Sequence, residues 1–137
     1  MAGSINTGGV HHVTITVTDV ERSRAFYEQI LGFQKVGEFG PRAIMFNGAM
    51  RLVLTPPPDP AQAIRDDRFN ENRVGLDHLS IAVESREELE RAVDLFDQEG
   101  VEHGEIKDMG QRTAIYVLAF RDPDNIQLEL TAPYAAG

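Results

Sequence analysis

The sequence predicts an α+β fold made of two copies of one βαβββ module, which together form a curved mixed sheet. Three observations predict it. A strand pattern that begins at His12 recurs 66 residues later at His78, an amphipathic helix pattern follows each copy, and the closing strand patterns also match. Alternation of apolar and polar residues indicates a strand, whereas apolar residues three and four apart indicate a helix. We therefore expect modules over residues 10–55 and 76–132, joined by a linker over 56–75.

The opening strands of the two modules have two different faces. In each strand every second residue is apolar, and Thr14 of the first copy matches Ser80 of the second. We expect the helix of each module to cover the apolar face, because one helix can cover only one side of a sheet. The opposite, more polar face suits the lining of a cavity. The apolar faces comprise Val13, Ile15 and Val17, and Leu79, Ile81 and Val83.

Capping residues set the expected limits of both helices. Asp19 is a typical N-cap and Gly32 a typical stop for the first helix. Ser85 and Glu88 form a capping-box pattern that opens the second helix, and Gly100 ends it. Their apolar faces comprise Phe26, Tyr27, Ile30 and Leu31 in the first helix, and Leu89, Ala92, Val93 and Phe96 in the second.

Three further strands complete each module. Turn-forming residues precede the last strand in both, at 47–48 and at 122–125. Prolines interrupt the start of the linker, at 56–60, and its charged remainder is too polar to extend a sheet. Residues 1–9 are expected to be a disordered lead-in and 133–137 a short tail. The expected strands are 34–39, 43–46 and 52–55 in the first module, and 102–107, 113–120 and 128–131 in the second.

Composition excludes several classes of function. The 137 residues include no cysteine, which removes disulfides, thiolate nucleophiles and cysteine-ligated metals. A net charge of −9 disfavours partners rich in phosphate, so we expect neither nucleic-acid nor membrane binding. The sequence also shows no signal-peptide pattern and no apolar run long enough for a membrane span. We expect a cytoplasmic protein.

Strand parity brings two histidines and a carboxylate to the polar face. His12 and His78 lie on that face at matching repeat positions, and Glu129 alternates with the apolar residues of the last strand. Two imidazoles and one carboxylate form a known ligand set for divalent transition metals that leaves coordination positions open. The position in the first module that matches Glu129 is Val53, which cannot bind a metal. The alternative for each residue is an ordinary solvated or hydrogen-bonded side chain.

Three segments of the chain resemble the vicinal oxygen chelate superfamily. They are HHVTITVTDVERSRAFYEQILGF (residues 11–33), GLDHLSIAV (75–83) and AFRDPDNIQLEL (119–130), and the likeness extends over nearly the whole chain. This superfamily includes glyoxalases, epimerases, thiol transferases, extradiol dioxygenases and bleomycin-binding resistance proteins. The resemblance implies paired βαβββ modules around a metal-lined cleft. It also implies that His12, His78 and Glu129 bind a divalent ion, with Mn, Fe, Co, Ni and Zn all open.

The resemblance further implies an enzyme that binds a small substrate to the metal through neighbouring oxygens. Val53 stands where glyoxalases and epimerases usually place Glu or Gln, so the pattern is closer to thiol transferases and dioxygenases. Thr14 resembles a threonine near the nucleophile in thiol transferases, and with Glu129 it is a candidate catalytic residue; the favoured alternative is an ordinary strand threonine. A dioxygenase would also use a His and a Tyr near the site. His103 and Tyr116 are candidates by residue type only, and parity turns Tyr116 away.

Four other expectations follow. Family members of this size are typically homodimers, so the ligands can come from one chain or from both. The alternative function is a non-catalytic resistance protein that binds an antibiotic or another natural product. A phosphonate substrate would require converging cations, for which Arg51, Lys107, Arg112 and Arg121 are available; the favoured alternative is that they are isolated, solvated charges. Phe39, Met45 and Phe46 are expected in the core, and the alternative is that they line an apolar substrate wall.

Overall fold

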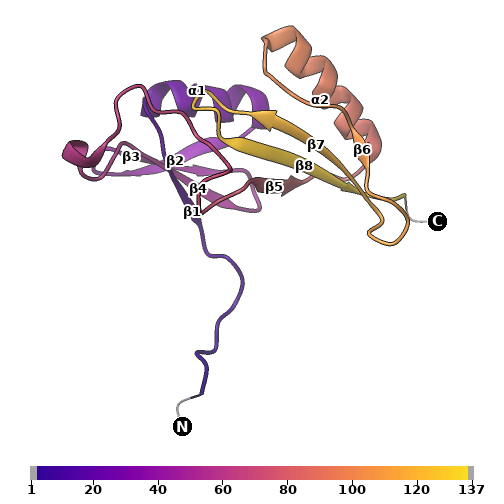
Figure 1. Cartoon of the computed structure of the whole chain (residues 1–137), viewed down its shortest axis with the longest axis horizontal. Helices are drawn as coiled ribbons and strands as arrows, with labels where there is room; N and C mark the ends of the chain where they lie inside the picture. The colour runs from indigo at the N-terminus through magenta and orange to yellow at the C-terminus, as the bar shows by residue number, and fades with distance from the viewer. Residues whose placement is uncertain (1–2, 136–137) are drawn as a thin grey trace. The chain divides into compact units, whose positions relative to one another are not determined.

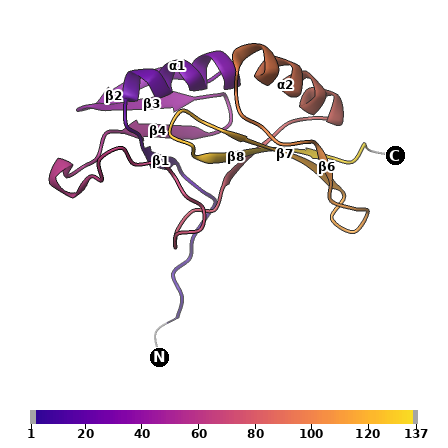
Figure 2. The same ribbon diagram turned by 45° about the horizontal axis from the view of Figure 1, so that its top comes forward.

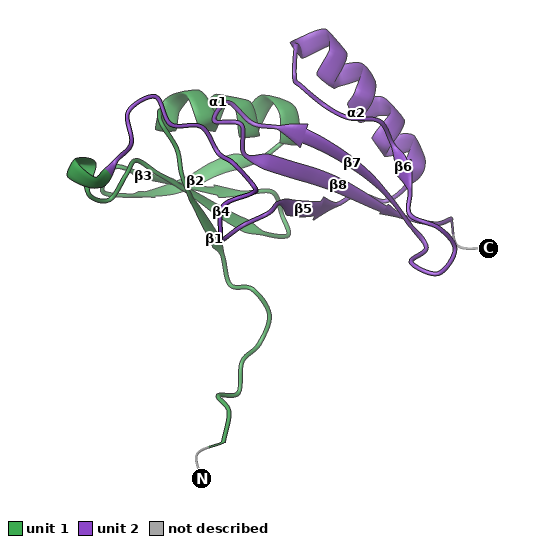
Figure 3. Cartoon of the chain, viewed as in Figure 1, with its two compact units in different colours: residues 1–62 green, residues 63–137 purple. Residues whose placement is uncertain are grey.

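Each half of the chain folds as a strand, a helix and three further strands (Figure 1). The computed structural model describes residues 3–135 and divides into two compact units, residues 1–62 and residues 63–137 (Figure 3). The predicted α+β class and the βαβββ order of both halves are confirmed. The first two residues of the expected lead-in and the last two of the expected tail lie outside the described residues.

The first unit contains one four-stranded mixed sheet. Its strand order is β1-β4-β3-β2, with β1 parallel to β4 and the other pairs antiparallel. Helix α1 packs against β2, β3 and β4, and Figure 2 shows it lying along one face of this sheet. The elements are β1 Val13–Thr16, α1 Val20–Leu31, β2 Gln34–Phe39, β3 Arg42–Phe46, β4 Arg51–Thr55 and a 3₁₀ turn, Pro60–Gln62.

The second unit repeats this arrangement. Its sheet has the order β5-β8-β7-β6, again with the first pair parallel, and helix α2 packs against β7 and β8. The matching order of the two sheets agrees with the repeat in the sequence. The elements are β5 Leu79–Ala82, α2 Arg86–Glu99, β6 Lys107–Asp108, β7 Ile115–Arg121 and β8 Gln127–Pro133.

The predicted caps define both helices. The Asp19 carboxylate accepts a hydrogen bond from the backbone N–H of Arg22, and the Ser85 hydroxyl accepts one from that of Glu88. The Glu88 side chain instead pairs with Arg91, so only the Ser85 side of the expected capping box is seen. Gly32 and Gly100 end the helices in the left-handed conformation, which favours glycine.

Apolar residues from the helix-facing side of each sheet form the core of each unit. In the first unit the Tyr27 and Phe33 rings meet edge to face at 6.1 Å, and in the second Phe96 stacks on Phe120 at 4.6 Å. Alternate strand residues are buried, as the period of two requires. The buried apolar side chains are those of Ile15, Val17, Tyr27, Phe33, Ala43, Met45, Leu52 and Leu54, and of Leu89, Phe96, Leu118, Phe120, Ile126, Leu128, Leu130 and Ala132.

Two strand predictions in the second module are wrong in extent. The expected strand 102–107 shrinks to β6 and an isolated bridge between His103 and Phe120, because the chain leaves the sheet after Gly104. The strand expected from residue 113 begins at Ile115. A turn precedes it, and Ala114 has a φ of 60°, which is incompatible with an extended strand.

The expectation of three core residues in strands β2 and β3 is also partly wrong. Met45 is fully buried and Phe46 is half-buried, but Phe39 is 67% exposed. Phe39 is the last residue of β2, the edge strand of its sheet, so little of the core lies beside it. The Arg42 guanidinium lies over its ring, 5.8 Å from the centroid.

Candidate functional site

His78 and Glu129 meet on the face of the second sheet that α2 does not cover. His78 immediately precedes β5 and Glu129 lies in β8, where parallel pairing places it opposite Ser80. The His78 Nε2 atom is 2.7 Å from the Glu129 Oε2 atom. The His78 side chain is 39% exposed and that of Glu129 is 19% exposed. Strand parity predicts that both side chains lie on this face, and both residues belong to the second unit.

Polar side chains continue along the same face. The hydroxyls of Ser80 and Thr131 contact each other across β5 and β8. Gln127, two residues before Glu129, donates from its amide to the carbonyl oxygen of Asp77 at 3.0 Å and to its carboxylate at 3.1 Å. This face therefore offers an imidazole, a carboxylate and hydroxyls to a ligand, in contrast to the apolar face beneath α2.

His12 and Thr14 lie in the first unit. His12 precedes β1 and is exposed, with its Nδ1 atom 2.9 Å from the Nδ1 atom of His11. Thr14 lies in β1 opposite Val53 of β4, and its side chain is exposed on the face away from the buried Ile15. Thr14 and Ile15 therefore point to opposite faces of the sheet, as the alternation in the sequence predicts. The membership of His12 in a shared ligand cluster stays a prediction.

The contact between His78 and Glu129 fits a pair of metal ligands. Two donors that bind one first-row ion at ~2.0–2.2 Å, near a right angle, lie about 3 Å apart. The observed separation of 2.7 Å between Nε2 and Oε2 is within a few tenths of an ångström of that value. Over residues 3–135, no group of three or more His, Asp or Glu side chains has a metal-binding arrangement. The pair thus supplies two donors of a suitable kind, and a third is needed.

An ion pair fixes the linker to the second sheet beside this face. The Arg121 guanidinium donates to both carboxylate oxygens of Glu71, at 2.8 and 3.0 Å. Arg121 lowers the pKa of Glu71 to about 2, chiefly through this hydrogen bonding. Arg121 also donates to Gln127, at 3.3 Å. Arg121, one of the four cations considered for a phosphonate, is therefore already paired with a carboxylate.

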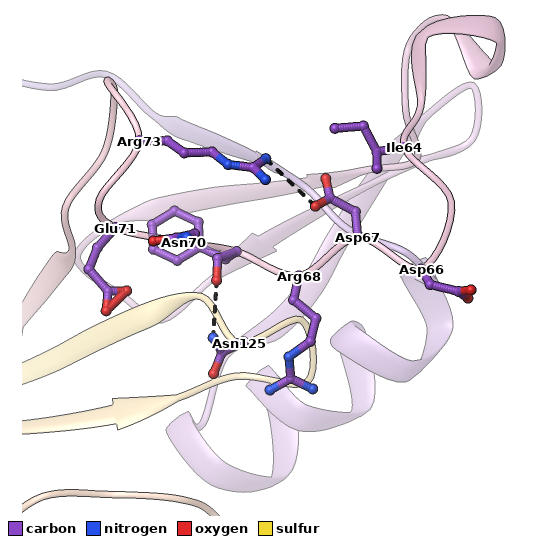
Figure 4. Close-up of a pocket in the computed structure, with 9 residues that line it drawn as sticks. Ile64, Asp66, Asp67, Arg68, Asn70, Glu71, Arg73 and Asn125 are labelled. Carbon is purple, nitrogen blue, oxygen red and sulfur yellow. Dashed lines mark hydrogen bonds and ion pairs between the residues drawn. The ribbon is translucent and has the colours of Figure 1, made fainter.

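A polar hollow lies between the linker and the turn before β8 (Figure 4). Asn125 donates to the backbone carbonyl of Phe69, and the Phe69 N–H donates to the carbonyl of Asp124. Figure 4 shows Arg73 pointing toward Asp67, at 3.9 Å. The side chains that line the hollow include both acidic and basic residues. The residues are Ile64, Asp66, Asp67, Arg68, Phe69, Asn70, Glu71, Arg73 and Asn125.

The two residues considered for a dioxygenase lie on the helix side of the second sheet. The Arg86 guanidinium of α2 lies over the Tyr116 ring, 4.9 Å from the ring centroid. The expected orientation of Tyr116 away from the site is therefore confirmed. His103 bonds Asp97 of α2 through Nε2 at 2.6 Å, and this contact raises its pKa. Neither side chain accompanies His78 and Glu129 on the open face.

Sequence reasoning missed two residues next to the pair. Asp77 and Gln127 contact each other, and the Asp77 carboxylate lies 2.8 Å from the His78 Nδ1 atom. Gln127 lies two residues before Glu129 and therefore shares its face, and Asp77 is adjacent to His78 in sequence. Their contact depends on the pairing of β5 with β8, which residue spacing alone does not give.

No α-helix within residues 3–135 has the length and apolar character that a membrane crossing requires.

Comparison with known proteins finds relatives over nearly the full length of the chain. The protein YwkD of Bacillus subtilis is 33% identical over 128 residues, which cover 88% of this chain and 94% of YwkD. The metallothiol transferase FosB of Staphylococcus saprophyticus is 29% identical over 122 residues, covering 88% of this chain and 74% of FosB.

A solved structure and a family model agree with these relatives. The glyoxylase/bleomycin resistance protein/dioxygenase domain from Frankia sp. EAN1pec superposes with a TM-score of 0.78 at 29% identity, covering 96% of both chains. Residues 9–130 match the family model described as glyoxalase/bleomycin resistance protein/dioxygenase superfamily. The βαβββ units are thus a shared architecture, and the chain belongs to the glyoxalase/bleomycin resistance protein/dioxygenase superfamily.

Proposed function

We propose that this protein is a small metal-dependent enzyme, with His12, His78 and Glu129 as the ligands of one divalent ion. The single observation that supports it most is the contact of 2.7 Å between His78 and Glu129 on an open sheet face. Imidazole and carboxylate suit Mn, Fe, Co, Ni and Zn, so the ion can be any of these. A small substrate would bind the ion through two neighbouring oxygens.

The metal, when bound, supplies Lewis acidity that stabilises negative charge on a substrate oxygen. The protein supplies position and hydrogen bonds. Glu129 and His78 fix one side of the site from adjacent strands. The Ser80 and Thr131 hydroxyls, further along the same face, can donate to a substrate oxygen. Thr14 is proposed to do so from the first module.

Thiol transfer to a small electrophile is the reaction type that the residues favour. Val53 removes the second carboxylate that a glyoxalase or epimerase would use as a base. The candidate dioxygenase residues, His103 and Tyr116, lie on the helix side of the sheet. The relative FosB is a metallothiol transferase. With an epoxide, the thiol sulfur would form a C–S bond as the C–O bond breaks, and the thiol proton would end on the released oxygen.

Elemental analysis of protein purified without a metal-affinity tag tests the proposal. We expect one equivalent of a divalent first-row metal per chain in the wild type and none in His78→Ala. Metal-loaded protein should then turn over at least one of three substrate sets: thiols with epoxides, catechols or 2-oxoaldehydes. Wild-type protein that takes up no metal, yet binds a drug stoichiometrically without turnover, would instead support the resistance-protein alternative.

A further inference from the structure

The two ring nitrogens of His78 have different partners. Nε2 faces the Glu129 carboxylate at 2.7 Å, on the side where the proposed metal would bind. Nδ1 faces the Asp77 carboxylate, whose Oδ1 atom is 2.8 Å away. An ionised carboxylate accepts hydrogen bonds and cannot donate them, so each contact is a hydrogen bond only where that ring nitrogen carries a proton; a metal on Nε2 would place the ring proton on Nδ1, facing Asp77. The ring is thus held from its far side with Nε2 directed at Glu129.

Asp77 is itself held in place, although its side chain is 68% exposed. The Gln127 amide donates to its backbone carbonyl and to the same Oδ1 atom that accepts from His78. Gln127 in turn accepts from Arg121, which the ion pair with Glu71 fixes. A chain of hydrogen bonds therefore runs from the linker through β7 and β8 to the back of His78.

We propose that Asp77 is a positioning residue that holds the His78 ring with Nε2 toward the metal position and accepts the Nδ1–H hydrogen bond when a metal occupies Nε2, with Gln127 holding Asp77. This inference rests on the proposed metal function. Histidine ligands commonly donate their second ring N–H to a carboxylate, which fixes the tautomer and increases the basicity of the ligating nitrogen. Removing such a partner typically weakens metal binding by about 10- to 100-fold.

The chain offers a matched control in a second histidine–carboxylate pair. His103 contacts Asp97 through Nε2 and the carbonyl of Gly104 through Nδ1, on the helix side of the same sheet. Asp97→Ala therefore removes one carboxylate from beside a histidine without touching the candidate site. Asp77→Asn serves as the conservative variant, because its amide oxygen still accepts from Nδ1.

The test combines the metal affinity of the protein with the His78 tautomer of metal-free Glu129→Ala protein, in which the competing carboxylate at Nε2 is removed. Zn²⁺ affinity is measured by competition with a chelating dye, and ¹⁵N NMR reports the protonated ring nitrogen about two pH units above the usual histidine pKa of about 6.5. We expect Asp77→Ala to bind Zn²⁺ about 10- to 100-fold more weakly, and we expect the same change made in Glu129→Ala protein to abolish the preference for Nδ1–H. Asp77→Asn should fall between it and the wild type, and Asp97→Ala should match the wild type.

The two readouts separate the inference from the proposed function. Failure of wild-type protein to bind any divalent first-row ion would end the metal proposal, while the NMR measurement would still decide whether Asp77 sets the tautomer. The role of Asp77 would be overturned by normal zinc binding in Asp77→Ala together with an Nδ1–H tautomer that the same change leaves unaltered in Glu129→Ala protein. An equal loss of affinity in Asp97→Ala would also overturn it, because the effect would then not be specific to His78.

Discussion

At the scale of single residues, the buried hydroxyl of Ser23 in α1 has a measurable cost. The residue is fully buried, and its Oγ atom has no hydrogen-bond partner among the described residues. A buried polar group without a partner loses its hydration and gains nothing in return. Alanine would remove that group and would also favour the helix.

We therefore expect Ser23→Ala to raise the free energy of unfolding by about 1 kcal/mol, measured by urea denaturation. Ser85→Ala is the matched control, because the same atoms are removed from the N-cap of α2, where the hydroxyl accepts from the Glu88 N–H. That change should lower the free energy of unfolding by about 1 kcal/mol. A loss of stability in both variants would show that the Ser23 hydroxyl has a partner in solution.

At the scale of elements, the pair of Glu71 and Arg121 fastens the linker to β7. Both side chains are largely shielded, at 25% and 22% exposed, and the contact uses both carboxylate oxygens. Such paired geometry is stronger than an ordinary surface ion pair. The hollow in Figure 4 shares Glu71, so its shape depends on this contact.

Glu71→Gln should lower the melting temperature at pH 7, and the difference from wild type should depend on pH. The pKa of Glu71 is lowered from 4.5 to about 2 in the folded protein. Its stabilisation is therefore fully present above about pH 4.5 and is lost as the pH falls toward 2. Melting temperatures of the two proteins should thus converge between pH 4.5 and pH 2.

Glu90→Gln provides the comparison for this prediction. Its partner Arg86 is 3.4 Å away on the exposed face of α2, and exposed pairs of this kind contribute little. We expect almost no change in melting temperature at either pH. A difference between Glu71→Gln and wild type that stays constant down to pH 2 would mean that the ion pair is not its cause.

The elements also show what sequence alone can predict. The order of elements and the helix ends at Gly32 and Gly100 follow from local signals, namely period and caps. Parity places His78 and Glu129 on one face, but their contact depends on the pairing of β5 with β8. The end of an edge strand and the path of a linker do not follow from local signals. They depend on contacts such as Glu71 with Arg121, which lie 50 residues apart in sequence and have no local pattern.

At the scale of the whole molecule, the proposed ligands are divided between the two units. His12 belongs to the first, and His78 and Glu129 to the second. If the protein is a dimer, the ion can be bound within one chain or between two. These arrangements make different predictions for a mixture of His12→Ala and Glu129→Ala chains.

We expect each variant alone to lose its metal. Co-expressed with different tags and purified as heterodimers, the two variants regain one intact site per dimer only if each site takes ligands from both chains. Heterodimers without metal would place all three ligands in one chain. Full metal content in either homogeneous variant would show that the altered residue is not a ligand.

The central claim is that His12, His78 and Glu129 bind one ion. The most direct measurement is an anomalous difference map from crystals of the protein grown with Co²⁺. We predict one strong peak at bonding distance, ~2.0–2.2 Å, from an imidazole nitrogen of each histidine and a carboxylate oxygen of Glu129. A cobalt peak bound elsewhere, or a peak that lacks any one of the three side chains, would contradict the claim.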